Sequence, residues 1–381
     1  MHARRRVIFA PSYYTREAHE GIAQYAREHD WELIADQAPM LKAPHDWHGD
    51  GVIAYYNGRK SEISRFLKSV TEPVINIGDQ PHQTGAPHIA IDERHTGCLA
   101  ARHFLERGFR RFLVLLTSSH NPVRKDLPAG FRRELQSEGL DCTVRAVPKR
   151  LLHHRTYPSW IHQQVRKHQL PLAILVDLPF DAVIIERALL DAGYNIPDEI
   201  SILARGDHNP ACNFAPVPLS AIELPYVRLG YEGARVLDAI LDGIPPPDET
   251  VLIKPYCVVS RESTQTIAAE DQRVKTAIAY IRSHFMEEIS TEHVARASHT
   301  SRRTLERNFR RELGRSVHEE IVRNRVAHAK QLLKTTNSTC ASIAYDAGFA
   351  TEKTFYRTFR THVCMTPLDY RNLPLRNNTM A

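Results

Sequence analysis

Several features common in proteins are scarce or missing in this chain of 381 residues, and each absence excludes a class of protein. Its six cysteines fall in no CxxC or zinc-finger spacing, so the sequence predicts neither a zinc site nor a disulfide framework. No apolar run approaches about 18 residues, so no membrane helix is expected. The apolar run after the basic Met1–Arg6 ends at Pro11, which is too short for the core of a signal peptide. We therefore expect a cytoplasmic protein with reduced thiols.

The sequence motifs of common enzymes and metal sites are also missing. No P-loop, GxSxG element or dinucleotide fingerprint occurs. Histidine pairs such as His45/His48 lack accompanying carboxylates or cysteines in a metal-ligand spacing, so no metal is predicted. No cysteine stands beside an evident histidine or basic cluster in the motif that methyl-acceptor chemistry needs, which argues against a methyl-accepting DNA-repair protein. The chain is expected to be a non-enzyme without a cofactor.

Charge is unevenly distributed along a chain of otherwise ordinary composition. Apolar residues make up 42% and charged residues 25%, which leaves ample material for the cores of two or three domains. Residues 271–372 contain 18 Lys+Arg and 11 Asp+Glu, whereas residues 1–270 contain 31 and 33. A surface that binds a polyanion is therefore predicted only in the C-terminal quarter.

The first 260 residues alternate short apolar runs with amphipathic segments. Strands are expected at Val7–Ala10, Gly51–Tyr55, Val74–Gly78, Phe112–Leu116, Leu172–Asp177, Ile200–Leu203 and Val251–Val259. Helices are expected at Glu17–His29, Glu62–Val70, His95–Gly108, Ala182–Gly193 and Val227–Gly243. This α/β alternation is typical of parallel sheets with helices on both faces, and its restart after about residue 117 indicates two lobes. The polar segment Ser260–Asp271 has no periodicity, which is typical of a linker.

The stretch Thr291–Gly314 predicts a helix-turn-helix motif. Leu305, Phe309 and Leu313 recur every four residues and share one helix face, while arginines 302, 303, 307, 310 and 311 occupy the others. Ser301 stands where a hydroxyl can cap the first free amides of this helix. A basic second helix after a tight turn fits a DNA major groove. The alternative is a surface helix with a solvated basic face.

A second copy of this pattern occurs about fifty residues later, at 338–360. Phe355 and Phe359 repeat the apolar positions of the first copy, and Gly348 occupies the turn. Ser316–Thr336 is expected to form one long helix between the copies, and about 20 helical residues span about 30 Å. Two recognition helices held this far apart can enter successive major-groove faces about 34 Å apart. The pattern predicts one polypeptide that reads two adjacent half-sites.

Residues 271–372 resemble the AraC/XylS-type DNA-binding domain. The matching blocks are SRRTLERNFRRELGRS at 301–316, RVAHAKQLL at 325–333, IAYDAGFATEKTFYRTF at 343–359 and TPLDYR at 366–371. The resemblance implies base contacts early in each recognition helix, from Arg303, Arg307, Glu352, Lys353 and Arg357. Ser301 is included in this DNA-binding set, and Arg302 and Arg310 are expected to hold phosphates. Two family glycines are replaced, by His299 in the first turn and by Cys364 before the Thr-Pro pair.

Residues 5–263 resemble the ligand-binding region of LacI/GalR-type repressors, which has a two-lobed periplasmic-binding-protein-like fold. The matching blocks are REAHEGIAQYARE at 16–28, DGVIAYY at 50–56, IAIDERHTGCLAARHFLERGFRRFLVL at 89–115, GYNIPDEISILARGDHN at 193–209 and LSAIELPYVRLGYEGARVLDAILDG at 219–243. The resemblance implies a ligand in the cleft between the lobes, bound by carboxylates, arginines and an aromatic ring. The expected ligand-binding residues are Tyr13, Arg16, Arg124, Asp177 and Asp207. The alternative for each is a salt-bridge residue on a surface loop.

The order of the two regions adds to this interpretation. LacI/GalR-type repressors carry a helix-turn-helix at the N-terminus, whereas this chain has an AraC-type module at the other end. This order resembles that of pentose-operon regulators, and it implies a homodimeric activator of pentose (xylose-like) catabolic genes, with RNA polymerase as a further candidate partner. A regulator of another small molecule, or a sugar-binding receptor, is the alternative.

The predicted domains follow from these two resemblances. A ligand-binding domain is expected at 1–263, a linker at 264–272 and a DNA-binding domain at 273–373. The helix-turn-helix units are expected at 291–314 and 338–360.

Overall fold

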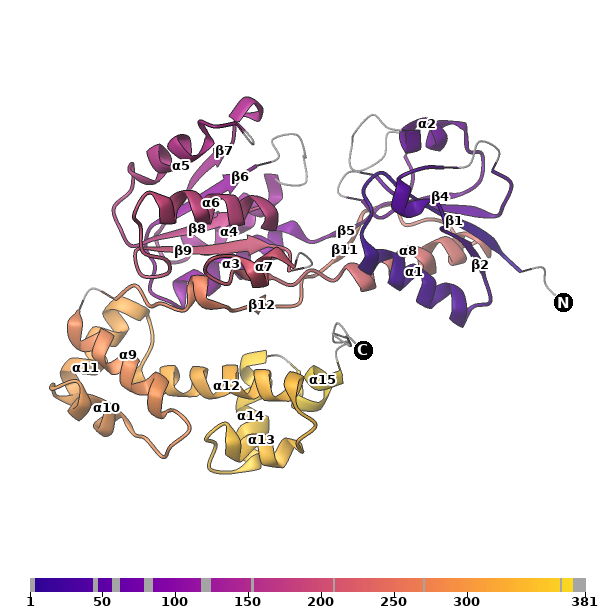
Figure 1. Cartoon of the computed structure of the whole chain (residues 1–381). Coiled ribbons are helices and arrows are strands. Elements are labelled where there is room, and N and C mark those ends of the chain that lie inside the picture. The colour runs from indigo at the N-terminus through magenta and orange to yellow at the C-terminus, as the bar shows by residue number, and fades with distance from the viewer. Residues whose placement is uncertain are drawn as a thin grey trace. The chain divides into compact units, whose positions relative to one another are not determined.

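The computed structural model describes residues 4–43, 47–56, 62–78, 85–117, 125–151, 154–207, 210–269, 271–363 and 365–372. The chain divides into two compact units (Figure 1). Unit one comprises Met1–Leu105 and Phe109–Thr266, and unit two comprises Glu106–Gly108 and Ile267–Ala381. No helix in the described part of the chain is long and apolar enough to cross a membrane.

The first lobe of unit one contains a four-stranded parallel sheet. Its order is β2-β1-β3-β4, with β1 (Arg6–Pro11), β2 (Glu32–Ile34), β3 (Gly51–Tyr55) and β4 (Val74–Asn76). The helices are α1 (Arg16–Glu28), α2 (Glu62–Ser69) and α8 (Tyr226–Leu241), with a short 3-10 helix at Ala38–Met40. Every residue of β3 is buried, as expected for a strand covered on both faces.

The second lobe contains a six-stranded sheet in the order β12-β10-β9-β8-β6-β7. The strands are β6 (Phe112–Leu116), β7 (Thr143–Ala146), β8 (Leu172–Val176), β9 (Ile200–Arg205), β10 (Ser220–Ile222) and β12 (Val258–Val259). All neighbours are parallel except β12, which runs antiparallel to β10. The helices are α3 (Glu93–Leu105), α4 (Asp126–Gln136), α5 (Tyr157–Val165), α6 (Pro179–Asp191) and α7 (Ala211–Phe214), with 3-10 helices at Lys149–Leu151 and Glu262–Thr264.

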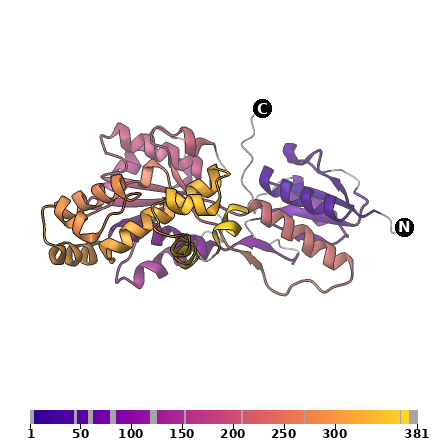
Figure 2. The ribbon, with the colours of Figure 1, turned by 90° about the horizontal axis from the view of Figure 1, so that it is seen from below.

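Glycine allows two helices of the first lobe to approach closely. Helices α1 and α8 lie side by side, although about two hundred residues separate them in the chain (Figures 1 and 2). A Cβ added at Gly230 would lie 2.0 Å from the carbonyl oxygen of Ala18, and one at Gly21 would lie 1.9 Å from that of Val227. Both distances are far below van der Waals contact, so any larger residue would push the helices apart.

Two expectations for unit one need correction. The second sheet does not start after residue 117, because β6 already belongs to it and α8 returns to the first lobe. The single strand expected at Val251–Val259 is two, because Pro255 interrupts it: β11 (Val251–Ile253) pairs with β5 (Ile89–Ile91), and β12 pairs with β10. The pattern also missed several short or less regular elements: β2, β5, β7, β10, α4, α5 and α7. Periodicity reports how a segment is buried but not which sheet it joins.

The segment predicted to be a linker, Ser260–Asp271, is packed at its start into unit one and near its end into unit two. The hydroxyl of Ser263 donates to the carbonyl of Ile202 at 2.7 Å and accepts from the Ser220 amide at 2.8 Å. Further on, Ile267 and Ala269 are buried in the core of unit two. The packing could not be predicted from the segment itself, because the hydrogen-bond partners of its polar side chains are distant in sequence.

In the residues that the structure describes, the regular elements of unit two are all helices, and they enclose two separate apolar cores. Its helices are α9 (Gln272–His284), α10 (Thr291–Ala297), α11 (Arg302–Leu313), α12 (Val317–Thr335), α13 (Cys340–Asp346), α14 (Glu352–Val363) and α15 (Pro367–Asn372). The long helix α12 contributes Val317 and Ile321 to the first core, and Val326, Ala329 and Leu333 to the second. Two small helical bodies are therefore joined by one helix (Figure 1).

Candidate nucleic-acid interface and effector site

The first recognition helix, α11, has defined caps at both ends. The amide of Thr304 donates to the Ser301 hydroxyl at 3.2 Å, which confirms the predicted N-cap. Gly314 ends the helix with a φ of 70°, in the left-handed region that glycine adopts at low cost. The helix is therefore fixed at both ends before any contact with DNA.

Helix α11 buries one side and exposes a basic one. Leu305 and Phe309 are fully buried in the first core of unit two. Arg303, Arg307 and Arg310 are exposed. Positions 303 and 307 are one turn apart, so their guanidinium groups share a face and can reach neighbouring base edges.

Two neighbours on the same basic surface are already paired. Arg302 forms an ion pair with Glu292 of α10, and Arg311 contacts Glu312 at 2.9 Å. A carboxylate partner occupies some of the N–H donors of an arginine and competes with a phosphate for the guanidinium. Among the predicted phosphate contacts, Arg310 is thus better placed than Arg302.

The second recognition helix, α14, repeats this arrangement fifty positions later. The amide of Thr354 donates to the Thr351 hydroxyl at 3.2 Å, as Thr304 does to Ser301. Burial along residues 351–360 follows that along 301–310, with a single difference, at position 358. Phe355 and Phe359 are buried in the second core, while Glu352, Lys353 and Arg357 are exposed. The predicted internal repeat is confirmed in three dimensions.

The two turns before these helices differ. His299 has a φ of 50° in the first turn, and Gly348 has a φ of 80° in the second. A histidine in the left-handed region is uncommon but tolerated, which explains how the replacement of the family glycine is accommodated. The two turns also differ in length. In the first turn the capping residue Ser301 comes two positions after His299, and in the second Thr351 comes three positions after Gly348. The other replaced glycine, at Cys364, lies outside the described residues.

The sequence pattern missed the role of Asp271, which was assigned to the linker. Its carboxylate caps α9 by accepting from the backbone amide of Arg273 at 2.8 Å, and it accepts from the side-chain Nδ2 of Asn308 in α11 at 2.7 Å. The hydrogen bond from the Arg273 guanidinium, with smaller effects of that residue's amide and charge and of Arg311, lowers the pKa of Asp271 to about 2. The position of this aspartate directly before a helix could have indicated its role as an N-cap.

Helix α12 sets the separation of the two recognition helices. It has 19 residues, which at 1.5 Å per residue span about 28 Å. Successive major-groove faces on one side of a duplex lie about 34 Å apart. Two capped basic helices at the two ends of such a spacer can contact adjacent half-sites on the same side of DNA.

The predicted effector residues lie largely at the carboxyl ends of strands in unit one. Asp177 follows β8 and is fully buried, and its Oδ1 accepts from the Thr117 amide at 2.9 Å and hydroxyl at 2.7 Å. The carboxylate therefore ties the end of β8 to the end of β6. Tyr157, which the pattern missed, is buried near it: burial, followed by the charges of Asp181 and Asp177, raises the pKa of Tyr157.

The other predicted effector residues have different surroundings. Asp207 follows β9 and pairs with Arg261 at 2.8 Å, with little exposure of either side chain. Tyr13 is half exposed, with its ring centroid 6.0 Å from that of Tyr55. Arg16 is 80% exposed and pairs with Glu20 on its own helix at 2.8 Å. Arg124 lies outside the described residues. The assignment of these five to an effector stays a prediction.

Comparisons with known proteins agree with this architecture. Residues 101–264 match a family model described as a periplasmic binding protein-like domain, and residues 294–373 match a helix-turn-helix domain. The xylose operon regulatory protein of Escherichia coli is 26% identical over 377 residues, covering 94% of each chain. The regulatory protein SoxS of Salmonella typhimurium is 33% identical over 104 residues, covering 27% of this chain and 97% of SoxS.

A solved structure shows the same fold over the full length. The xylose-binding transcription activator xylR aligns with a TM-score of 0.60 and 23% identity, over 97% of this chain and 98% of that one. The doubled, capped basic helices, the sheet-based sensor and these likenesses lead to one assignment. The chain belongs to the AraC/XylS-type family of helix-turn-helix transcription regulators, in a form whose sensor is a periplasmic-binding-protein-like domain.

Proposed function

We propose that this regulator activates pentose-catabolic genes in response to a pentose that binds unit one. The observation that carries the DNA-binding half is the pair of capped recognition helices with matching burial at the two ends of α12. The pentose is supported by the full-length similarity to a regulator named for the xylose operon. Because such a regulator acts on the chromosome by binding, we propose a cytoplasmic location and no catalytic activity.

The proposed effector site lies at the carboxyl ends of the strands of unit one. Ligands of open α/β sheets bind there, and Tyr13, Asp177 and Asp207 all follow strand ends. Carboxylates accept hydrogen bonds from sugar hydroxyls, and an aromatic ring packs on the apolar sugar face. Arg261 is included in this proposal because its ion pair orients Asp207.

The proposed response is a shift between two conformations of a homodimer. A sugar that binds more tightly to the state with closed lobes would populate that state, in proportion to the difference in affinity. The change would alter how the paired recognition helices engage DNA and RNA polymerase.

A thermal-shift screen of pentoses and hexoses tests the effector. A sugar at about 100 times its Kd stabilises the folded state by about 2.7 kcal/mol, which raises Tm by several degrees. Asp207→Asn should abolish the shift, whereas the matched variant Asp191→Asn, at an exposed position of α6, should retain it. If no sugar raises Tm, the sensing half of the proposal is wrong.

The base-reading role of Arg303 gives a separate prediction. Arg303→Ala should lower affinity for a preferred duplex by about 1–3 kcal/mol and relax sequence preference at one base position. Arg310→Ala should instead weaken binding to all sequences equally and reduce the salt dependence, as loss of a phosphate contact does. Binding of both variants to a randomised duplex library, followed by sequencing, measures the difference. Equal weakening across sequences for Arg303→Ala would assign Arg303 to phosphate.

A further inference from the structure

Three residues between helix α3 and strand β6 belong to unit two. Helix α3 ends at Leu105 in unit one, Glu106–Gly108 lies in unit two, and the chain is back in unit one at Phe109. The polypeptide therefore enters unit two here as well as after Thr266. The loop Glu106–Gly108 therefore leaves the main chain of unit one and is held in unit two by non-covalent contacts.

Each of the three residues has its own contact inside unit two. A carboxylate oxygen of Glu106 lies 3.3 Å from a guanidinium nitrogen of Arg323 in α12. The carbonyl oxygen of Arg107 accepts from the Ala268 amide at 2.8 Å. Gly108 has a φ of +79°, and a Cβ there would lie 2.7 Å from a methyl carbon of Leu313, the last residue of α11. The segment thus touches the junction of α11 and α12.

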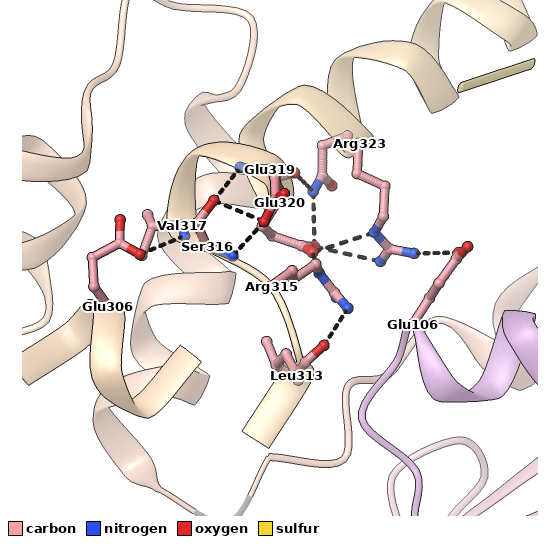
Figure 3. Close-up of polar contacts among 10 residues, drawn as sticks. Glu106, Glu306, Leu313, Arg315, Ser316, Val317, Glu319, Glu320 and Arg323 are labelled. Carbon is pink, nitrogen blue, oxygen red and sulfur yellow. Dashed lines mark hydrogen bonds and ion pairs between the residues drawn. The ribbon is translucent and has the colours of Figure 1, made fainter. Parts of the chain in front are cut away.

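Arg323 is part of a charge cluster at that junction. Glu320 is fully buried and accepts from Arg315 at 2.6 Å and from Arg323 at 3.2 Å (Figure 3). Arg315 also donates to the carbonyl of Leu313 at 3.2 Å. Arg323 therefore connects the buried carboxylate of Glu320 on one side with Glu106 on the other. Glu106 is thus linked through Arg323 and Glu320 to Arg315, which contacts the last residue of α11.

The opposite end of α3 is fixed to the strand that leads to Asp207. Glu93, in the first turn of α3, forms a buried ion pair with Arg205, the last residue of β9. Near the other end, His103 contacts the hydroxyl of Thr264 at 2.9 Å, shortly before the chain enters unit two again. Helix α3 has 13 residues and spans about 20 Å, from Glu93 to the residue before Glu106.

We propose that Glu106 is the positioning residue through which a change at the effector site reaches the α11–α12 junction. The path runs from Asp207 and Arg205 through Glu93 and α3 to Glu106, and then to Arg323. This inference rests on the proposed function in one respect, the placement of the effector near Asp207.

The first experiment measures how a sugar changes DNA affinity. Full-length wild type, Glu106→Gln and the control Glu138→Gln, at an exposed position after α4, are titrated onto a duplex that the wild type has selected from a random library. Titrations are repeated with saturating D-xylose and with the other pentoses. The Glu106–Arg323 pair is half exposed on the Glu106 side, so its loss costs little stability and the variant should fold.

We expect Glu106→Gln to lose the effect of sugar on DNA affinity while it keeps its affinity for each ligand alone. Sites that communicate typically change each other's affinity about 5- to 150-fold, and this factor should fall below about 2-fold in Glu106→Gln. Its affinities for sugar alone and for DNA alone should stay within about 2-fold of wild type. Retention of the full factor in Glu106→Gln overturns the inference. If no pentose changes the DNA affinity of the wild type, the proposed effector is wrong. The second experiment then tests the role of Glu106 without a sugar.

The second experiment needs no sugar. Hydrogen exchange of the peptide that covers residues 102–110 is compared with and without the selected duplex. Because binding free energies are reciprocal, DNA should slow exchange there in wild type and in Glu138→Gln, but not in Glu106→Gln. If hydrogen exchange of this peptide is the same with and without DNA in the wild type, Glu106 does not couple the two units and the inference is wrong.

Discussion

Replacing Phe309 with alanine is expected to unfold the first half of the DNA-binding unit and leave the second half folded. Phe309 is fully buried in the first core, which it shares with α9, α10 and the start of α12. Truncation of a buried phenylalanine costs about 3–5 kcal/mol. A helical body of this size has a stability of similar magnitude, so most molecules would lose the first half.

Hydrogen exchange resolved by peptide measures this outcome in the full chain. Phe309→Ala should accelerate exchange in α10 and α11 while α13 and α14 keep their protection, and DNA affinity should fall to the level of one half-site. Phe359→Ala is the matched control, since Phe359 has the equivalent place in the second core and should produce the reverse pattern. Uniform acceleration in both halves would show that the two cores unfold as one.

Replacing Glu320 with alanine is expected to have a comparable effect through charge. Glu320 is fully buried between Arg315 and Arg323, and its removal takes the buried counter-charge from both guanidinium groups and leaves Arg323 with the half-exposed Glu106. Breaking a buried ion pair on one side costs about 3–5 kcal/mol. Glu319→Ala, at the adjacent position, removes a residue of the helix capping box and should cost only about 1 kcal/mol.

Glu320→Ala should also remove part of the loss in the free energy of unfolding that the wild type shows at acid pH. Burial by itself raises the pKa of Glu320, but the charges and hydrogen bonds of Arg323 and Arg315 outweigh burial and lower it. The stabilisation is therefore complete above the unfolded pKa of about 4.3 and is lost as pH falls through the lower folded pKa.

Urea unfolding at a series of pH values, followed by hydrogen exchange in α12, measures this dependence. Tryptophan fluorescence does not serve, because the three tryptophans, at 31, 47 and 160, all lie in unit one. An unchanged acid dependence in Glu320→Ala would contradict the assignment.

The sequence predicted the recognition helices well because their signals are local. Apolar residues four apart and a hydroxyl before the first turn determine both the buried side and the start of α11 and α14. The parallel sheets were also predictable, from apolar runs that alternate with amphipathic segments. In each case, the residues that carry the signal are the residues that form the element.

Sheet membership and side-chain pairing could not be predicted in this way. The pairing of β5 with β11 joins segments about 160 residues apart, and nothing within either segment encodes its partner. The ion pair between Asp207 and Arg261 and the place of Glu106 in unit two depend in the same way on distant contacts. Local pattern therefore located most of the candidate residues, but it did not show which of them already have partners.

The continuous helix α12 constrains how this family of proteins can diverge. One inserted residue would rotate the second helical body by about 100° about the axis and turn its basic surface away from the groove. Seven inserted residues would nearly restore the rotation but add about 10 Å, or about three base pairs of rise, which changes the phase of the DNA helix by roughly a quarter turn. New target sequences can thus arise by exchange of exposed side chains on α11 and α14, whereas the interval between the half-sites is inherited with the length of α12.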